Sequence, residues 1–116
     1  MLLASTYAGI GFGNAGVHIC HGLSYPISGL NQKYIHPGYD SNHKIIPHGI
    51  SVVVSSPAVF KFTSKSDPDR HIHAAKLFGA NTTNTRREDA GQVLADGISF
   101  FILLLSPPQQ SIDVQK

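Results

Sequence analysis

Small and apolar residues fill the start of the chain before proline and glycine begin to interrupt it. Residues 2–24 contain no proline and many small side chains, which favours a helix. A long polar loop is then expected, with proline or glycine at Pro26, Gly29, Pro37, Gly38 and Pro47. The first part of the pattern therefore predicts one helical segment followed by a loop.

The apolar stretch "GISVVVSSPAVFKF" that follows His48 fits either a strand or a buried helix. Its periodicity alone does not separate the two. Pro57 disfavours a central strand, because proline cannot donate a hydrogen bond to a neighbouring strand. We therefore expect a kinked or interrupted helix here.

Two further helix starts are marked by capping residues. Asp67 and Pro68 are typical of an N-cap and a first helical residue, and Gly79 is expected to stop this helix. Residues 85–88, "TRRE", have the capping-box pattern, which predicts a helix that runs towards Leu105 and ends at the two prolines 107 and 108. The whole pattern predicts a single all-α domain.

The segment "GIGFGNAGVHICHG", residues 9–22, contains the spacing Gly11-x-Gly13-x-x-Gly16 of a dinucleotide-binding fingerprint. That fingerprint requires a strand before it and an acidic residue about 20 positions later. The preceding "MLLASTYA" is poor in β-branched residues, and the nearest acid, Asp40, lies beyond a loop. Each glycine inside a helix costs about 1 kcal/mol relative to alanine. We therefore favour a buried helix whose glycines allow close approach of a neighbouring helix or cofactor, with the fingerprint as the weaker interpretation.

The histidines leave two interpretations open. On one continuous helix, Asn14, His18, His21 and Tyr25 would share a face. They can be hydrogen-bonded core side chains, which the spacing alone favours. They can also include metal ligands, because neutral imidazole suits zinc and iron, and His48 could then supply a second ligand from another helix start.

Three other candidate residues are expected to have ordinary structural roles. His71 follows Asp67 by four residues, but the capping role already explains Asp67. We therefore expect His71 and His73 to lie at the surface. Cys20 is expected to be a small buried thiol.

Composition and charge remove several classes of function. The 116 residues carry a formal net charge of +2, and the basic residues are scattered, whereas a nucleic-acid binder needs a concentrated basic face. One cysteine cannot form an internal disulfide, so a reducing compartment is the default expectation. The apolar run 98–105 is far shorter than the roughly 20 residues that span a bilayer. Because the first basic residue is Lys33, the chain is also expected to carry no targeting segment.

The motif "AGIGFGNAGVHICHGLSYPISG", followed by "PHGISVVVSSPAVFKF", resembles the iron-containing alcohol dehydrogenase family. Within that family it is most similar to the mitochondrial hydroxyacid–oxoacid transhydrogenases. The resemblance implies that residues 1–98 are part of the C-terminal helical metal-binding domain of a two-domain, dehydroquinate-synthase-like fold. Residues 99–116 no longer resemble the family and are expected to form a divergent apolar tail.

The resemblance also implies roles for individual residues. His21 of the "HG" step and His48 of "PHG" correspond to metal ligands of the family. Tyr25 stands where many members have a second histidine, and it is a candidate catalytic residue that orients substrate or cofactor. His18 corresponds to a position that is small in many relatives and is not carried over as a ligand. No residue is assigned to dinucleotide binding, since the glycine-rich helix would face the nicotinamide without forming its phosphate loop.

The implied reaction is a metal-assisted hydride transfer from 4-hydroxybutyrate to 2-oxoglutarate. A divalent metal, iron or zinc, would act as a Lewis acid on the substrate hydroxyl, and bound NAD would carry the hydride. The implied partners are these small hydroxyacid and oxoacid substrates, with a homo-oligomer possible in the parent enzyme. The implied location is the mitochondrion.

The family's other two metal ligands and its dinucleotide-binding domain precede the matching segment, so we expect this chain to be a fragment of the enzyme. Two histidines do not complete a catalytic metal site, which usually has three protein ligands and an open position. The competing hypothesis is a truncated or alternative product without catalytic activity, at most an interaction piece. On either view, we expect no measurable turnover from this chain alone.

Overall fold

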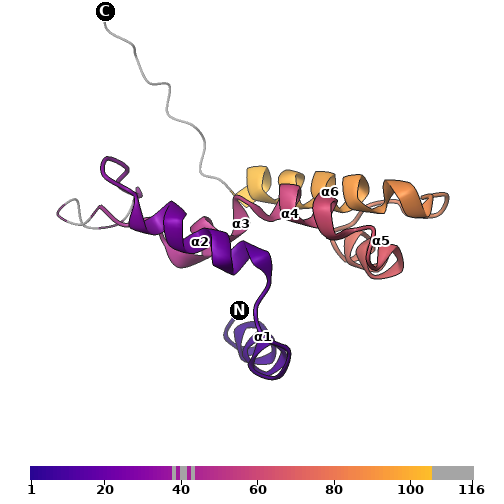
Figure 1. Cartoon of the computed structure of the whole chain (residues 1–116), viewed down its shortest axis with the longest axis horizontal. Helices are drawn as coiled ribbons and strands as arrows, with labels where there is room; N and C mark the ends of the chain where they lie inside the picture. Colours follow the sequence, from indigo (N-terminus) through magenta and orange to yellow (C-terminus); the bar gives the residue numbers. More distant parts are fainter. Residues whose placement is uncertain (38, 40–41, 43, 106–116) are drawn as a thin grey trace, which may run out of the picture. The chain divides into compact units, whose positions relative to one another are not determined.

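The computed structural model describes residues 1–37, 39, 42 and 44–105, and these residues form helices and connecting loops without a strand. The chain divides into two compact units, one of residues Met1–Ser56 and a second that begins at Pro57. The first contains α1 (Leu2–Ala15), α2 (Ile19–Gly29) and α3 (His48–Val53) (Figure 1). The second contains α4 (Ser56–Thr63, whose first residue ends the first unit), α5 (Pro68–Leu77) and α6 (Ala90–Leu105). The all-α prediction is confirmed.

The prediction of one helix over residues 2–24 is wrong, because the chain breaks into α1 and α2 at Gly16. Gly16 has φ +78° and ψ −179°, a conformation that favours glycine and ends α1. His18 then precedes α2 as its N-cap with extended backbone angles. Asn14 and His18 therefore do not continue one helical face with His21 and Tyr25, and the predicted polar stripe does not form. The segment "GIGFGNAG" is nevertheless helical up to Ala15, as predicted, and forms no strand–turn–helix phosphate loop.

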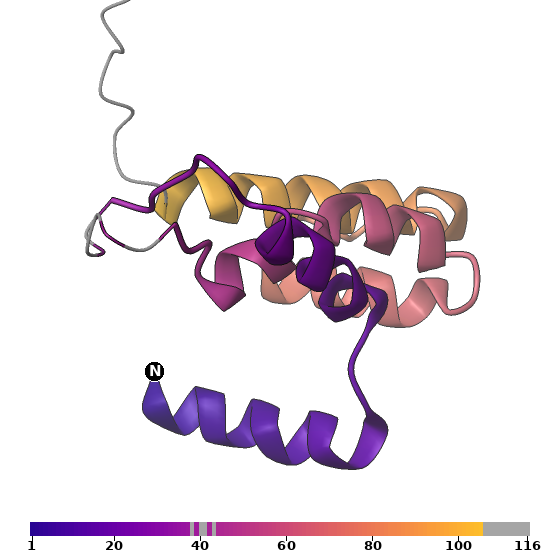
Figure 2. The same cartoon turned by 60° about the vertical axis from the view of Figure 1, so that its left-hand side comes forward.

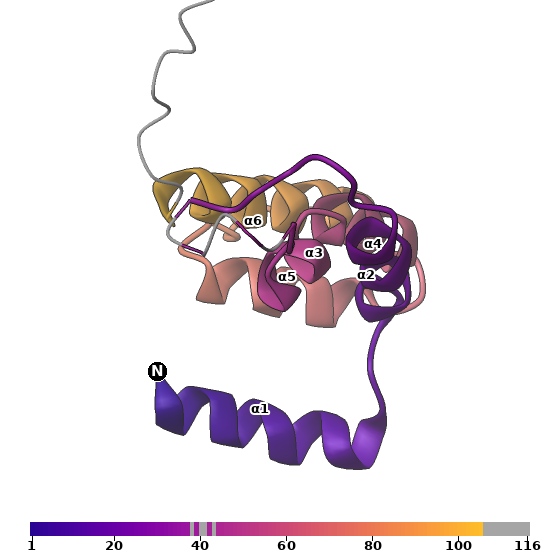
Figure 3. The same ribbon diagram turned by 90° about the vertical axis from the view of Figure 1, so that its left-hand side faces the viewer.

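The first helix is exposed along its whole length, which corrects the expectation of a buried glycine-rich helix. Figure 3 shows α1 as one uninterrupted helix, and none of the residues Leu2–Ala15 is buried. A Cβ added at Gly11 or Gly13 would meet nothing within 4 Å. The described residues therefore include no surface that comes close to these two glycines.

The second and third helices pack against each other (Figure 1). Pro26 was predicted to begin the loop, but α2 continues through it to Gly29. Pro26 lies inside this helix, so it donates no hydrogen bond to the Gly22 carbonyl, and the helix continues for three more residues without that bond. The connection to α3 is held by Asn31, whose Nδ2 donates hydrogen bonds to the carbonyls of Tyr34 (2.8 Å) and Lys44 (2.9 Å).

The apolar stretch after His48 forms two short helices rather than a strand. The first, α3, ends at Val53, and α4 begins at Ser56 with Pro57 in its first turn, where proline is tolerated. The expectation of an interrupted helix is confirmed.

The fifth helix has the ends that the sequence predicts. The Asp67 carboxylate accepts a hydrogen bond from the backbone N–H of Arg70, and Pro68 is the first helical residue. At the other end, Gly79 has φ +87°. The N–H groups of Gly79 and Ala80 donate to the carbonyls of Lys76 and Ala75, which is the Schellman pattern. Both the N-cap and the glycine stop are confirmed.

The capping box predicted at residues 85–88 does not form. A 3₁₀ turn, Arg87–Asp89, precedes α6, and its N-cap is Arg86 without a side-chain capping bond. The carboxylate of Glu88, which a capping box would turn back towards Thr85, instead lies 2.7 Å from Arg86 Nη1. Arg86 also donates to Asp89, and this bond together with the charges of Asp89 and Glu88 raises the arginine pKa. The helix itself runs to Leu105 as predicted.

The apolar core of the second unit lies between α5 and α6, which run alongside each other (Figure 2). The buried hydrophobic residues of this unit are Val59, Ala75, Ala90, Leu94, Ala95 and Ile98. At Gly91, an added Cβ would clash with the side chain of Ser64 and lie 3.0 Å from Lys61 Cα. Glycine is therefore required where the start of α6 contacts α4.

The apolar end of α6 is largely exposed. Phe100 is 65% exposed and Leu103 to Leu105 between 66% and 73%, whereas Ile98 is buried at 4%. The exposure predicted for this run is confirmed beyond Ile98. Residues 106–116, with the predicted helix stop at prolines 107 and 108 and most of the predicted tail, lie outside the described residues. In the part of the chain that is described, no helix is both long and apolar enough to span a bilayer.

Candidate metal-binding site

The two histidines predicted as metal ligands lie together within the first unit. His21 is in the first turn of α2, and His48 is the first residue of α3, directly after the N-cap Pro47. Their ring centroids are 5.4 Å apart and the ring planes are inclined by 56°. The prediction that these two imidazoles lie close together, despite the loop between them, is confirmed.

One nitrogen of this pair is buried without a hydrogen-bond partner among the described residues. This atom is Nδ1 of His21. Buried polar atoms are nearly always paired, so an unpaired one requires an explanation. Two ring nitrogens bound to one ion are at most about 4.2 Å apart, since each Zn–N bond is about 2.0–2.1 Å. Rings separated by 5.4 Å between centroids can present nitrogens within that limit.

The pair is not accompanied by further ligands. Among the described residues, no group of three or more histidine, cysteine, aspartate or glutamate side chains is arranged to hold a metal ion. The His48 side chain is exposed, so one side of the pair is accessible to solvent and to ligands from outside this unit. The two residues therefore fit one part of a metal site.

A hollow of about 430 Å³ adjoins His48. Its lining includes Ser24, Tyr25 and Ser28 of α2. It also includes Lys44 and Ile46 of the loop before α3, and His48 at the start of α3. Its volume falls in the range of small-molecule pockets, roughly 300–1,000 Å³. Tyr25, the candidate catalytic residue, is 74% exposed and lies in this lining. Lys44 and Asn31, which holds the Lys44 backbone, could not be predicted as site residues, because a single loop residue of either type carries no recognisable sequence pattern.

Cys20 and His18, which precede His21 in the sequence, do not belong to the histidine pair. Cys20 is 4% exposed and is a free thiol, as predicted. Its Sγ lies 3.7 Å from Nδ1 of His18. His18 itself stands at the N-cap of α2, outside the helix that carries His21.

His71, which was expected at the surface, is buried in the second unit. Its Nδ1 lies 2.7 Å from the Asp67 carbonyl, and its Nε2 lies 3.2 Å from Thr63 Oγ1. The ring also contacts Phe60 edge to face, with centroids 5.8 Å apart. His71 thus links the end of α4 to the start of α5. The position of a single histidine in the sequence could not reveal this tertiary role. His73 is exposed, as predicted.

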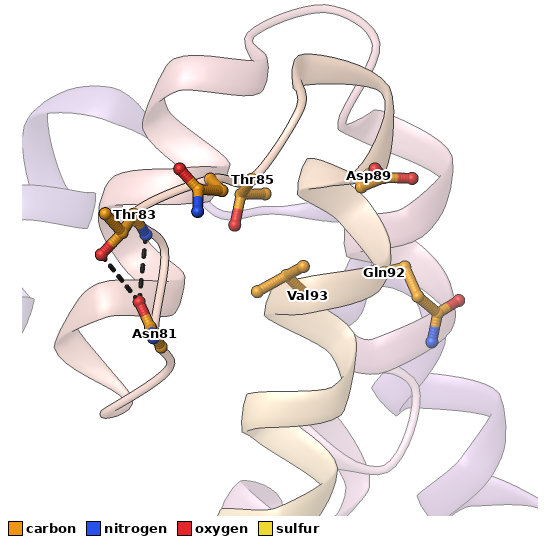
Figure 4. Close-up of a pocket in the computed structure, with 7 residues that line it drawn as sticks. Asn81, Thr83, Thr85, Asp89, Gln92 and Val93 are labelled. Atoms are coloured by element: carbon orange, nitrogen blue, oxygen red, sulfur yellow. Dashed lines mark hydrogen bonds between the residues drawn. The ribbon is translucent and has the colours of Figure 1, made fainter.

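Another pocket, in the second unit, offers no ligand of the histidine or cysteine type. Asn81, Thr83 and Thr85 of the loop before α6 line it, together with Asp89, Gln92 and Val93 (Figure 4). Asn81 Oδ1 accepts hydrogen bonds from the Thr83 backbone N–H (3.1 Å) and hydroxyl (2.8 Å), and these bonds fix the loop. The residues that line this pocket also stabilise the entry to α6.

Comparison with known proteins shows which family this chain resembles. A family model described as the C-terminal part of the Fe-containing alcohol dehydrogenase family matches residues 1–106. The mitochondrial hydroxyacid-oxoacid transhydrogenase of Bos taurus is 58% identical over 102 residues, which cover 88% of this chain and 22% of that protein. The Homo sapiens protein of the same name is 56% identical over the same shares. A probable hydroxyacid-oxoacid transhydrogenase of Dictyostelium discoideum, also mitochondrial, is 50% identical over 93% of this chain and 20% of its own length.

The chain therefore spans about a fifth of the length of the curated relatives it matches. No solved structure is significantly similar to it. The family match covers both histidines of the pair, both helices that carry them and the whole of α6. On these grounds, the chain belongs to the iron-containing alcohol dehydrogenase family.

Proposed function

We propose that this chain contributes two metal ligands, His21 and His48, to the site of a hydroxyacid–oxoacid transhydrogenase. The observation that carries the proposal is the pair itself. The two imidazoles are 5.4 Å apart between centroids, and one has a buried nitrogen without a partner among the described residues. Both residues lie in the segment that matches the family model. A hydrogen-bonded core pair, the other interpretation of these histidines, would leave no such nitrogen.

The metal in question is a divalent ion, iron by family membership or zinc by ligand chemistry. Such an ion supplies Lewis-acid polarisation of a substrate oxygen when it is bound. The part played by this chain is to hold two neutral imidazoles at a fixed separation. In the first unit, α2 and α3 provide that separation because they pack directly against each other.

The proposed substrates are 4-hydroxybutyrate as hydride donor and 2-oxoglutarate as acceptor, with NAD as carrier in the complete enzyme. The hollow beside His48 supports a small acid as ligand. Lys44 is a positively charged side chain in its lining, and a lysine ammonium can donate hydrogen bonds to a carboxylate. Tyr25 lies in the same lining, which supports a role for its side chain in orienting a substrate or cofactor.

We further propose that the complete protein acts in mitochondria, as the names of its relatives state for them. The remaining ligands of the site and the dinucleotide-binding half would come from parts of the enzyme outside the matching segment. The chain by itself is then expected to show no turnover, because hydride transfer requires donor, acceptor and metal in one geometry. A non-catalytic product is the second candidate function, favoured by the lack of a third ligand among the described residues.

The direct test is metal binding by the 116-residue chain. Co²⁺ takes the place of zinc or iron, and its visible absorption measures the binding. We expect His21→Ala and His48→Ala each to weaken Co²⁺ binding by well over about tenfold, since even outer-shell partners of ligands are worth 10–100-fold. His73→Ala, which removes an exposed histidine from α5, is the matched control and should leave the binding unchanged. Equal binding by all three variants would refute the assignment.

Activity provides a second, separate measurement. The purified chain is assayed with iron or zinc, NAD and 4-hydroxybutyrate, and no turnover is expected. Turnover that disappears in the His21→Ala variant would show that the chain is an enzyme on its own.

A further inference from the structure

The buried side chains of α2 and α3 are all small. The buried residues of α2 are Cys20 and Ser24, and the buried residue of α3 is Ser51. Ser24 is 2% exposed and Ser51 is fully buried at 0%. These two helices pack against each other, and we infer that their buried positions lie at the contact. The distance between packed helices depends on the side chains at the contact, and small side chains allow a close approach.

The two serines have the same relation to the two candidate ligands. Ser24 follows His21 by three residues, and its Oγ donates a hydrogen bond to the His21 carbonyl at 2.7 Å. Ser51 follows His48 by three residues, and its Oγ donates to the His48 carbonyl at 2.8 Å. Each hydroxyl is therefore satisfied within its own helix. Neither serine needs a polar partner across the contact, and this leaves the helices free to approach closely.

We propose that Ser24 and Ser51 are positioning residues whose small volume sets the spacing of α2 and α3. That spacing brings the imidazoles of His21 and His48 to a separation that one metal ion can bridge. The metal part of this inference rests on the proposed function. The spacing part does not, because the distance between the two rings can be measured in the metal-free chain.

The test compares threonine with alanine at each serine in the full chain. Threonine keeps the hydroxyl and adds one methyl group, whereas alanine removes the hydroxyl and adds no volume. The two readouts are the nuclear Overhauser effect between the His21 and His48 ring protons without metal, and the Co²⁺ affinity. We expect Ser24→Thr and Ser51→Thr to lose the ring-to-ring signal and to bind Co²⁺ roughly tenfold more weakly, because overpacking a tight contact displaces its neighbours.

Alanine at the same positions should keep both the ring-to-ring signal and the Co²⁺ affinity close to those of the unmodified chain. Ser66 is the matched control, since it is exposed and its Oγ also donates to a carbonyl three residues earlier, that of Thr63. Ser66→Thr and Ser66→Ala should change neither readout. Circular dichroism verifies that the helices persist. Cysteine at the same serine, with a smaller increase in volume, replaces any threonine variant that loses them and is judged by the ring-to-ring signal alone, because a thiol can itself bind Co²⁺.

Threonine variants that retain the ring-to-ring signal overturn the proposal. Alanine variants that lose it also overturn the proposal, because the hydroxyl and not the volume would then set the spacing. A strong signal in the unmodified chain without Co²⁺ binding would count against the proposed metal function, while the threonine and alanine variants would still decide the positioning role. The two ideas therefore fail in different ways.

Discussion

The two units of this chain are both helical, but they are stabilised by different kinds of contact. In the described part of the second unit, six hydrophobic residues are buried, and they include Leu94 and Ile98 of α6. In the described part of the first unit, the only buried hydrophobic residue is Cys20, and the other buried side chains are serines. The second unit thus contains an apolar core of its own, whereas the first unit contains the candidate chemistry and almost no apolar core.

This difference indicates where each unit obtains its stability. Burial of a Leu or Ile side chain contributes roughly 1.5–3 kcal/mol, and serine contributes little of this kind. Tyr7, Ile10 and Phe12 of α1 are more than half exposed, and nothing described lies near Gly11 or Gly13. The first unit therefore carries apolar surface of the kind that a binding partner or another domain covers. Four predictions test this contrast, in order of decreasing effect.

The largest effect is expected from the core of the second unit. Leu94 is 1% exposed, and Leu94→Ala should lower the free energy of unfolding by about 2–5 kcal/mol, the cost of removing buried methyl groups and leaving a cavity. Leu103, which is 73% exposed on the same helix, provides the control, and Leu103→Ala should change stability by less than about 0.5 kcal/mol. Urea unfolding followed by circular dichroism measures both. Equal effects would mean that α6 has no buried side.

Glycine substitutions should have opposite signs in the two units. At Gly91, an added methyl group meets Ser64 and the Lys61 backbone, so Gly91→Ala should destabilise the second unit by about 1–3 kcal/mol. At Gly22 in α2 nothing lies within 4 Å, so Gly22→Ala should raise stability by up to about 1 kcal/mol through helix propensity. Thermal unfolding of the two variants gives the signs. Destabilisation by Gly22→Ala would reveal a contact that the isolated chain does not show.

The N-cap of α5 should have a smaller effect. The Asp67 carboxylate accepts from the Arg70 N–H at 3.2 Å, and Asp67→Ala removes this bond. We expect a loss of about 1 kcal/mol, typical of N-caps, measured by urea unfolding. Asp67→Asn, which keeps an accepting oxygen, should retain most of the stability. If alanine and asparagine are equivalent, the cap contributes nothing.

The smallest change in stability is expected at the exposed end of α6, where a substitution should clearly change aggregation and dye binding. Leu104 is 66% exposed, and Leu104→Gln should alter the free energy of unfolding by less than about 0.5 kcal/mol. It should nevertheless reduce the binding of an apolar dye and the tendency to aggregate, because exposed apolar patches drive association. Fluorescence titration and light scattering measure these changes. An unmodified chain that stays monomeric at high concentration and binds no dye would contradict the prediction.

Local signals in the sequence were reliable where one or two residues dictate the backbone. Asp67 with Pro68, and Gly79, mark the ends of α5 because capping and a positive φ are properties of the residues themselves. Pro57 marked the interruption between α3 and α4 for the same reason. The capping box at residues 85–88 failed because Arg86 competes for Glu88, and such competition depends on side-chain positions that no spacing rule contains.

The candidate site was partly predictable. The two motifs around His21 and His48 pointed to these residues, and the structure brings them together. The prediction of a polar stripe through Asn14 and His18 assumed one continuous helix, and the positive φ of Gly16 ends that helix before His18. Glycine permits such a conformation without requiring it, so the sequence could not say whether the helix continues.

The residues alone determined that this chain is helical and where α5 ends, and the resemblance of two motifs to a known family pointed to His21 and His48 as candidate ligands. These properties follow from backbone preferences and from motifs that can be read locally. Only the tertiary structure decided that α2 packs on α3 and that Ser24 and Ser51 are buried. It alone decided that a nitrogen of His21 is buried without a partner among the described residues, and that His71 is enclosed between two helices. Each of these depends on which surfaces pack together, and packing is a sum over contacts between residues far apart in the sequence.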